Sequence, residues 1–188
     1  MARARALVER GRAFHPTGDA PAALATADAA GNPSVRWILL KEVDSRGFVF
    51  YTNAHSRKGR EIDARPRAAL ACYWPDLGAQ LRAEGPVEEV SPAEADAYWA
   101  TRPFDSRVGA IASDQSAPLA STEALVGGVM DVLRDLAGRA PARPPHWTGF
   151  RVVPDALEFW RQGENRLHHR ELYRRTAGGD WSHQLLYP

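Results

Sequence analysis

Short runs of β-favouring residues, separated by turn residues, recur along most of the chain and constrain its fold more than any other feature. The predicted strands cover 22–27, 35–43, 48–52, 68–74, 80–90, 150–153, 157–160, 171–175 and 181–186. The turn sequence Asp44-Ser45-Arg46-Gly47 between two of them predicts a hairpin. Strictly alternating strand and helix units are missing. We therefore expect a mainly β protein, a small barrel with peripheral helices, and not a doubly wound parallel sheet.

Helix signals mark four segments between or before these runs: 1–14, 57–65, 92–102 and 121–137. The strongest is Ser91-Pro92-Ala93-Glu94, which combines a capping serine, a proline at the first helical position and a glutamate three residues after the serine. In 121–137 the apolar residues recur at helical spacing. These helices are expected on the outside of the barrel.

Length and charge exclude several classes of protein. A chain of 188 residues suggests one domain over 1–188, in which 1–21 form a short N-terminal helix and loop. No apolar run reaches 18 residues, and the basic start lacks the apolar core of a secretory signal. The 24 basic and 23 acidic residues nearly cancel, which argues against nucleic-acid binding. With one cysteine, Cys72, no internal disulfide forms, and we expect a cytoplasmic protein.

The chain has 24 lysine and arginine residues, and only two of them are lysines, Lys41 and Lys58. Lys58 lies in the segment 53–60, where Ser56 is placed to cap a helix whose first turn also holds Arg57 and Arg60. Cations at a helix N-terminus have the wrong sign for the helix dipole. A bound anion would reverse that argument, so the segment is read either as a phosphate site or as a solvated basic turn.

Two further groups of polar residues could bind an anion. Arg36 and Lys41 flank an apolar strand and have opposite parity, so both reach one ligand only through a bulge or around the strand end. Tyr98 and Arg102 share a helix face, and Ser106 follows. Such side chains suit a second phosphate monoester, although an isolated pair of this kind is commonly surface decoration.

The segment 166–170 packs two arginines and two histidines into five residues. Its adjacent histidines do not have the spacing of a zinc pair, and no metal site is expected. A general base there is possible. The chain has no nucleophile elbow, dinucleotide-binding glycine motif or P-loop.

Taken in order, these segments resemble the pyridoxamine 5′-phosphate oxidase family over roughly residues 22–188. The segments that carry the resemblance are RWILLK (36–41), GFVFYTN (47–53), SRKGRE (56–61), RPRAAL (65–70), YWPDLGAQLR (73–82), YWATRPFDSRVGAIASDQS (98–116), PPHWTGFRVVPDALEFW (144–160), NRLHHR (165–170), YRR (173–175) and LLYP (185–188).

The resemblance implies a split β-barrel homodimer that binds flavin mononucleotide (FMN) at the subunit interface. It implies that the flavin phosphate is held by Arg36, Arg57 and Lys58. The other implied FMN residues are Trp37, Ile38, Leu39, Leu40, Lys41, Tyr51, Thr52, Gln80, Gln115, Ser116, Trp160 and Arg170. The implied substrate residues are Lys41, Tyr98, Arg102, Ser106, Arg166, Leu167 and His168, of which Arg166 and His168 lie over the pyridine ring as the catalytic pair.

The implied reaction oxidises pyridoxamine or pyridoxine 5′-phosphate to pyridoxal 5′-phosphate. A hydride equivalent passes from the 4′ carbon to the flavin, the amine product is hydrolysed with release of ammonia, and dioxygen reoxidises the flavin to give hydrogen peroxide. The flavin supplies the redox chemistry, while the protein orients the substrate and tunes charge.

The chain departs from the family pattern at Phe104, Arg107, Ile111 and His169, and in its short N-terminus. These departures bear on substrate preference and closure of the site. One alternative is a related oxidase of the phenazine-biosynthesis branch, which tends to lose the lysine present here as Lys41. The other is a non-catalytic flavin-binding protein, which has no need of a second phosphate site.

Overall fold

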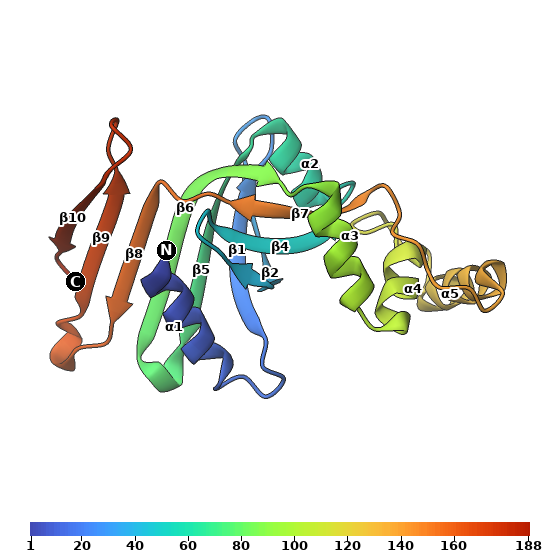
Figure 1. The fold of residues 1–188 in the computed structure, drawn as a ribbon, viewed down its shortest axis with the longest axis horizontal. Helices are drawn as coiled ribbons and strands as arrows, with labels where there is room; N and C mark the ends of the chain where they lie inside the picture. The colour runs from blue at the N-terminus through green and yellow to red at the C-terminus, as the bar shows by residue number, and fades with distance from the viewer.

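The computed structural model describes residues 1–188, and it consists of one curled antiparallel sheet with helices around it (Figure 1). The strands are β1 (Ala20–Ala27), β2 (Pro33–Leu40), β3 (Glu42–Val43), β4 (Phe48–Asn53), β5 (Arg67–Trp74), β6 (Ala79–Glu89), β7 (Trp147–Val152), β8 (Ala156–Arg161), β9 (His169–Arg175) and β10 (Trp181–Leu186). The helices are α1 (Ala2–Arg12), α2 (Arg57–Ala64), α3 (Pro92–Thr101), α4 (Phe104–Ala112) and α5 (Thr122–Leu136), with single 3₁₀ turns at Pro75–Leu77 and Glu164–Arg166. No helix is long and apolar enough to cross a membrane.

The strand order is β10-β9-β8-β6-β5-β1-β2, and β7 continues from β6 to β4 and β3. The long strand β6 makes this branching possible, because its first half pairs with β8 and its last residues pair with β7. The change of partner occurs at Gly85, where an added Cβ would stand 2.0 Å from the carbonyl oxygen of Val153. A side chain there would push the crossing strands apart, so glycine allows the sheet to curl into a half-barrel.

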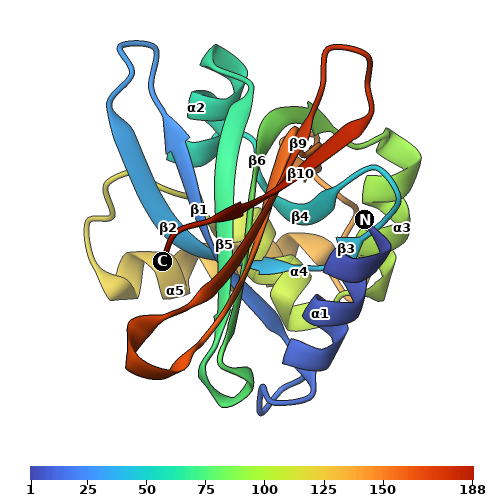
Figure 2. The ribbon, with the colours of Figure 1, turned by 90° about the vertical axis from the view of Figure 1, so that its left-hand side faces the viewer.

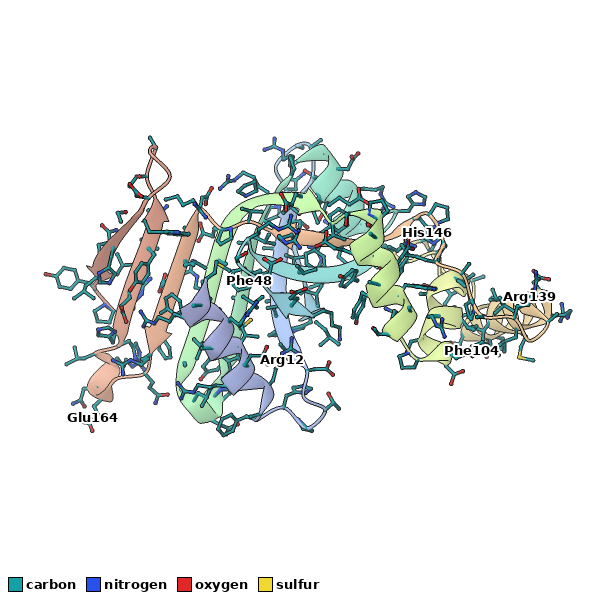
Figure 3. The ribbon with its side chains drawn as sticks, viewed as in Figure 1. Arg12, Phe48, Phe104, Arg139, His146 and Glu164 are labelled. Carbon is teal, nitrogen blue, oxygen red and sulfur yellow. The ribbon has the colours of Figure 1, made fainter.

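The inner face of the half-barrel holds the hydrophobic core. Phe48, Leu24, Leu81 and Val152 are completely buried there, and α1 closes one side with Val8. Phe48 lies near the centre of the molecule in Figure 3. Cys72 belongs to the same core, and burial raises the pKa of its thiol to about 12. Figure 2 shows α1 beside β3 and the strong twist of the β9–β10 ribbon.

The outer face of the same sheet is open, and it is apolar over β2 and β5. Trp37, Val35, Leu39 and Tyr73 are 71%, 69%, 39% and 52% exposed. Residues paired across neighbouring strands point to the same face of a sheet. The pairs Trp37–Ala23, Ala23–Ala71 and Ala71–Arg82 therefore put these side chains on one surface that continues across β6 to β8 and β9. A soluble monomer rarely leaves such a patch uncovered.

The mainly β fold predicted from the short runs is confirmed, and each predicted strand is present with small shifts at its ends. Two details differ. The run 35–43 is two strands, because β2 ends at Leu40 and β3 pairs with β4 instead of β1. The sequence analysis did not predict helix α4. Its N-cap is Pro103, which offers no capping side chain, and its sequence includes Gly109 among β-branched residues, so the local helix signal is weak.

Candidate active site

A cavity of about 450 Å³ opens between β2, β4 and the helices α2, α3 and α4. Twelve residues line it: Trp37, Ile38, Leu39, Lys41, Tyr51, Thr52, Lys58, Tyr98, Arg102, Pro103, Ser106 and Gln115. All but Pro103 are residues that the sequence analysis assigned to the cofactor or the substrate. Segments more than 60 residues apart in sequence are thus brought to one hollow.

Lys58 forms the floor of this cavity beside the start of α2. Ser56 caps the helix, as predicted, because its side chain accepts a hydrogen bond from the Gly59 N–H. The Lys58 ammonium donates to Gln115 Oε1 at 2.8 Å and to Ser56 Oγ at 3.2 Å, and no carboxylate pairs with it. Burial, assisted by the charge of Arg36, lowers the pKa of Lys58 to about 8. The buried ammonium therefore lacks a counter-ion.

Gln115 is fixed by its neighbours. Its Oε1 atom accepts hydrogen bonds from Lys58 and from Thr52 Oγ1, the latter at 3.0 Å. Ser116, which follows it, is exposed and has a left-handed backbone with φ of 78°. The chain therefore makes a tight turn at the mouth of the cavity, where it leaves α4.

Arg36 and Arg57 stand next to the cavity floor, but both are paired with Glu61. Arg57 Nε lies 2.8 Å from Glu61 Oε1, and Arg36 Nη2 lies 3.1 Å from Glu61 Oε2. Thr26 and Ser34 also donate to this carboxylate. Burial acts to raise the pKa of Glu61, but the hydrogen bonds from Ser34, Thr26 and the two arginines outweigh it and lower the pKa to about 2. We call Glu61 and these four donors the Glu61 cluster.

Arg102 lies on the opposite wall, at the end of α3. Its Nη2 atom donates to the backbone oxygen of Ser106 at 2.8 Å, and its guanidinium carbon lies 4.8 Å from the ring centre of Trp147. Its Nε atom is buried without a hydrogen-bond partner. Burial lowers the pKa of Arg102, which also has no carboxylate partner. An oxyanion in the cavity would supply the opposite charge that the Arg102 guanidinium lacks.

Tyr98 contributes an aromatic wall next to Arg102. Its ring stacks on Tyr51 of β4 with centroids 4.0 Å apart, and Trp147 of β7 lies behind both rings. Burial raises the pKa of Tyr51 to about 12, so its hydroxyl stays protonated at neutral pH.

Lys41 reaches the cavity because the strand breaks beside it. It lies between β2 and β3, and its ammonium is 3.4 Å from Asp19 Oδ1. The sequence-based parity argument set Lys41 and Arg36 on opposite faces unless a bulge or a strand end intervened, and the end of β2 at Leu40 is that interruption. The Leu40 side chain itself is fully buried in the core, so only its backbone is available to a ligand.

The remaining predicted residues gather elsewhere, on β6, β8, β9 and the connection between β8 and β9: Gln80, Trp160, Arg166, Leu167, His168 and Arg170. Gln80 pairs with Trp160, and Trp160 pairs with Arg170, on the open outer face of the sheet. The His168 ring lies 4.6 Å from that of Trp160. Arg170 donates to Glu158 at 2.8 and 3.1 Å. Leu167 is 72% exposed.

The residues of the cavity and the residues around β8 and β9 are well separated within one chain. Figure 3 labels Glu164, in the turn before His168, and Phe104, at the start of α4, near opposite ends of the molecule. Trp37 of the cavity and Trp160 share the outer face, but four strand steps separate β2 from β8. At the usual strand spacing this is on the order of 20 Å along the sheet.

Two residues of this region were not predicted. Trp147 lies beneath Arg102, and its only sequence signal was its place in the segment 144–160. Glu61 has a clearer signal, because it follows Arg57 by four residues on one face of α2. A helical ion pair at that spacing would have identified the partner of Arg57.

Comparison with known proteins agrees with the predicted resemblance. A family model described as pyridoxamine 5′-phosphate oxidase matches residues 11–133, and one described as the pyridoxine 5′-phosphate oxidase C-terminal dimerisation region matches residues 147–188. The chain is 56% identical over 165 residues to a pyridoxine/pyridoxamine 5′-phosphate oxidase of Myxococcus xanthus, covering 88% of this chain and 80% of that protein. It is 50% identical over 188 residues to that of Anaeromyxobacter dehalogenans, covering 100% and 94%.

Solved structures give the same fold. PhzG from Burkholderia lata, solved with tetrahydrophenazine-1-carboxylic acid, is 34% identical with a TM-score of 0.86, covering 100% of this chain and 88% of that one. An FMN-binding protein related to pyridoxamine 5′-phosphate oxidase from Nostoc punctiforme is 20% identical with a TM-score of 0.76, covering 100% and 95%. The predicted split-barrel fold is confirmed. The chain belongs to the pyridoxamine 5′-phosphate oxidase family.

Proposed function

We propose that this chain is an FMN-dependent oxidase that converts pyridoxamine 5′-phosphate and pyridoxine 5′-phosphate to pyridoxal 5′-phosphate. The observation that carries the proposal is a single cavity with two cations, the buried Lys58 and the half-buried Arg102, neither of which has a carboxylate partner. Buried charges in proteins are normally paired. The cavity is therefore suited to two anionic groups, and FMN and a B6 phosphate each bring one. Membership of the family names the reaction.

The residues of the cavity divide between the two ligands. Lys58 would hold the flavin phosphate, with Arg36 and Arg57 beside it, and Gln115 and Thr52 would face the flavin. On the other wall, the substrate phosphate would meet the guanidinium of Arg102 together with Tyr98, Ser106 and Lys41.

When bound, FMN supplies the two-electron redox chemistry, which protein side chains cannot supply. Arg102 would fix the substrate by its phosphate and so orient the pyridine ring. His168 Nδ1 accepts a hydrogen bond from the Gly163 N–H at 3.2 Å, so the neutral imidazole carries its proton on Nε2. That N–H, with the Arg166 guanidinium, would stabilise charge on the ring. In the overall reaction the substrate loses two electrons and two protons to dioxygen, giving hydrogen peroxide. With the amine substrate, one water molecule is also consumed, because it hydrolyses the imine to the aldehyde and releases ammonia.

The complete site would form between two copies of this chain. Trp160 lies four strands from the cavity of its own chain, yet on the same open sheet face as Trp37, and the His168 ring lies beside it. The dimerisation region named by the family model includes β8 and β9. A two-fold dimer across this face would bury the exposed apolar residues and bring one chain's His168 to the partner's cavity.

Mixing two impaired variants, assayed at a substrate concentration well below KM, tests this arrangement. Arg102→Ala damages the cavity half, and Arg166→Ala damages the β8–β9 half. If the halves come from different chains, refolding an equal mixture restores about a quarter of wild-type activity, because half the dimers are mixed and each has one intact site. A site built within one chain would give no recovery.

The activity itself is tested by an aerobic assay of both B6 phosphates, with and without FMN, following pyridoxal 5′-phosphate and peroxide. We expect turnover of at least one substrate that depends on FMN. A flavin-loaded protein that oxidises tetrahydrophenazine-1-carboxylic acid instead would support the phenazine-type alternative. A protein that binds FMN and turns over none of these compounds would support the non-catalytic one.

A further inference from the structure

Strand β7 presents one of its faces to α3, the helix that carries Tyr98 and ends at Arg102. Side chains two apart share a face of a strand, so Trp147, Gly149 and Arg151 form one row. Every residue of β7 is buried, because the core covers one face and α3 with its neighbours covers the other. This row is therefore the surface on which α3 rests.

Arg151 ends the row and is only 1% exposed. Its guanidinium contacts three carboxylates from three elements: Asp44 in the β3–β4 turn at 2.9 Å, Glu88 of β6 at 3.1 Å and Glu94 of α3 at 2.7 Å. The fork of an arginine can hold several carboxylates at fixed angles, whereas a lysine offers a single point of charge. Arg151 therefore fastens the first turn of α3 to the barrel.

Glu94 is the residue of α3 that Arg151 contacts. It completes the predicted capping box, accepting from the Ser91 N–H at 3.0 Å. The hydrogen bond from Arg151, followed by those from Ser91, lowers the pKa of Glu94 to about 2. Glu94 is therefore a charged carboxylate at neutral pH. Arg46 also pairs with Glu94, at 3.1 Å, but from the exposed side.

The other two residues of the row, Gly149 and Trp147, determine how closely α3 packs on β7. At Gly149 an added Cβ would stand 2.6 Å from the Tyr51 ring, so glycine lets Tyr51 lie against β7. Tyr98 then stacks on Tyr51, one helical turn after Glu94. Trp147 supports Arg102 from below. Fixing Glu94 in position therefore also fixes the two substrate-binding side chains that follow it on α3.

We propose that Arg151, acting through Glu94, is a positioning residue for the substrate phosphate. It fixes the position of α3 on the barrel, and this position determines the distance of Tyr98 and Arg102 from the phosphate. This inference rests on the proposed function. It assigns to a buried ion cluster outside the cavity control over phosphate recognition, and it leaves FMN binding to α2 and β2.

The test compares the affinity of the FMN-loaded protein for pyridoxal 5′-phosphate and for pyridoxal, which lacks the phosphate. Their ratio reports phosphate recognition without requiring turnover. Glu94→Gln removes the charge that Arg151 holds while keeping a side chain that can cap the helix. We expect the ratio to fall about tenfold, since small displacements of positioning groups have large effects. The FMN dissociation constant should stay within about twofold.

Two further variants separate positioning from general stability. Arg151→Lys keeps the charge but loses the fork, so its ratio should lie between those of wild type and Glu94→Gln. Glu171→Gln is the matched control: Glu171 also has a pKa of about 2 and pairs with Arg3 at 2.6 Å, but on the opposite side of the barrel from α3. It should lower the melting temperature and leave the ratio unchanged.

Each outcome decides between the claims. A folded Glu94→Gln protein with an unchanged ratio, or an equal fall in the Glu171→Gln control, would overturn the positioning role. A wild-type protein that binds pyridoxal as tightly as pyridoxal 5′-phosphate would instead overturn the proposed function, because it would have no phosphate site to position.

Discussion

The Glu61 cluster and the floor of the cavity are neighbours along α2, yet they treat positive charge in opposite ways. Arg57 turns to Glu61, where Arg36 also pairs with the same carboxylate. Lys58, the next residue, turns into the cavity and meets only the neutral oxygens of Gln115 and Ser56. Arg102 on the far wall is equally without a carboxylate.

The difference separates cations that organise the protein from cations that await a ligand. Removing a charge from water costs several kcal/mol unless an opposite charge offsets it. In the Glu61 cluster that offset comes from within the chain. In the cavity the chain supplies no such charge, and the proposed function places the anionic groups of the two ligands there. Four predictions test this distinction, and a fifth concerns an exposed ion pair that should matter for neither stability nor binding.

The largest effect is expected at Arg102. Arg102→Ala should lower kcat/KM for pyridoxine 5′-phosphate about 100-fold, mainly through KM, because the phosphate loses a desolvated charged donor. FMN affinity should change less than about twofold. Steady-state kinetics and a flavin titration measure the two effects. Equal losses in both would refute the division of the cavity into two anion sites.

Lys58→Ala should weaken FMN binding about 30-fold, since charged hydrogen bonds of this kind contribute about 2 kcal/mol. Quenching of flavin fluorescence by the apoprotein measures the dissociation constant. Riboflavin, which lacks the phosphate, is the matched ligand control, and its affinity should barely change. A similar loss for both ligands would place Lys58 at the ring instead of the phosphate.

The same lysine predicts a pH dependence. In the free protein the pKa of Lys58 is about 8, below its usual 10.5, because the group is buried. The ammonium that attracts phosphate is therefore present below pH 8 and is lost above it. Between pH 7 and 9.5 the FMN affinity should fall about tenfold. Lys58→Arg stays charged throughout and should give a flat profile over that range.

Glu61→Gln tests the paired side of the comparison. It removes the carboxylate of Arg36 and Arg57 and should lower the free energy of unfolding by about 1.5 kcal/mol. The pKa of Glu61 is about 2 in the folded chain against 4.5 as a free group, so its stabilisation is present above pH 4.5 and is lost as the pH falls toward 2. Acid unfolding of the variant should accordingly be less steep. A variant as stable as wild type would show that the cluster does not organise the protein.

The smallest effect is expected at Arg134, which pairs with Asp131 at 2.7 Å on exposed α5. Arg134→Ala should change stability by less than about 0.5 kcal/mol and leave both ligand affinities unchanged. Thermal unfolding and the titrations above measure this. A larger effect would mean that α5 contacts something beyond its own chain.

The sequence predicted more of the parts than of their arrangement. The Ser56 cap, the capping box at Ser91 and the strands follow from local signals, and the structure contains them. The position of Lys41 depended on where β2 ends, which pairing with β1 decides and the local pattern does not show. The separation of His168 from the cavity reflects strand order, a long-range property.

The pairing of charges was also out of reach of local patterns. Arg151 collects carboxylates 107, 63 and 57 residues away in sequence, so no spacing rule could have joined them. Glu61 was within reach, because its spacing from Arg57 is helical. The unpaired state of Arg102 could only be recognised once every neighbour was placed.

The placement of the lone cysteine bears on how long such a catalyst lasts. Hydrogen peroxide attacks thiolates and scarcely attacks thiols, and the attack begins a series of sulfur oxidations whose later stages are irreversible. Cys72 has no exposed surface and a pKa of about 12, so it presents neither access nor a thiolate. Of the sulfur side chains beyond the first residue, only Met130 on α5 is exposed, at 55%. Under the proposed function, hydrogen peroxide made at each turnover would therefore meet an exposed sulfur atom on α5 before it could reach the one in the core.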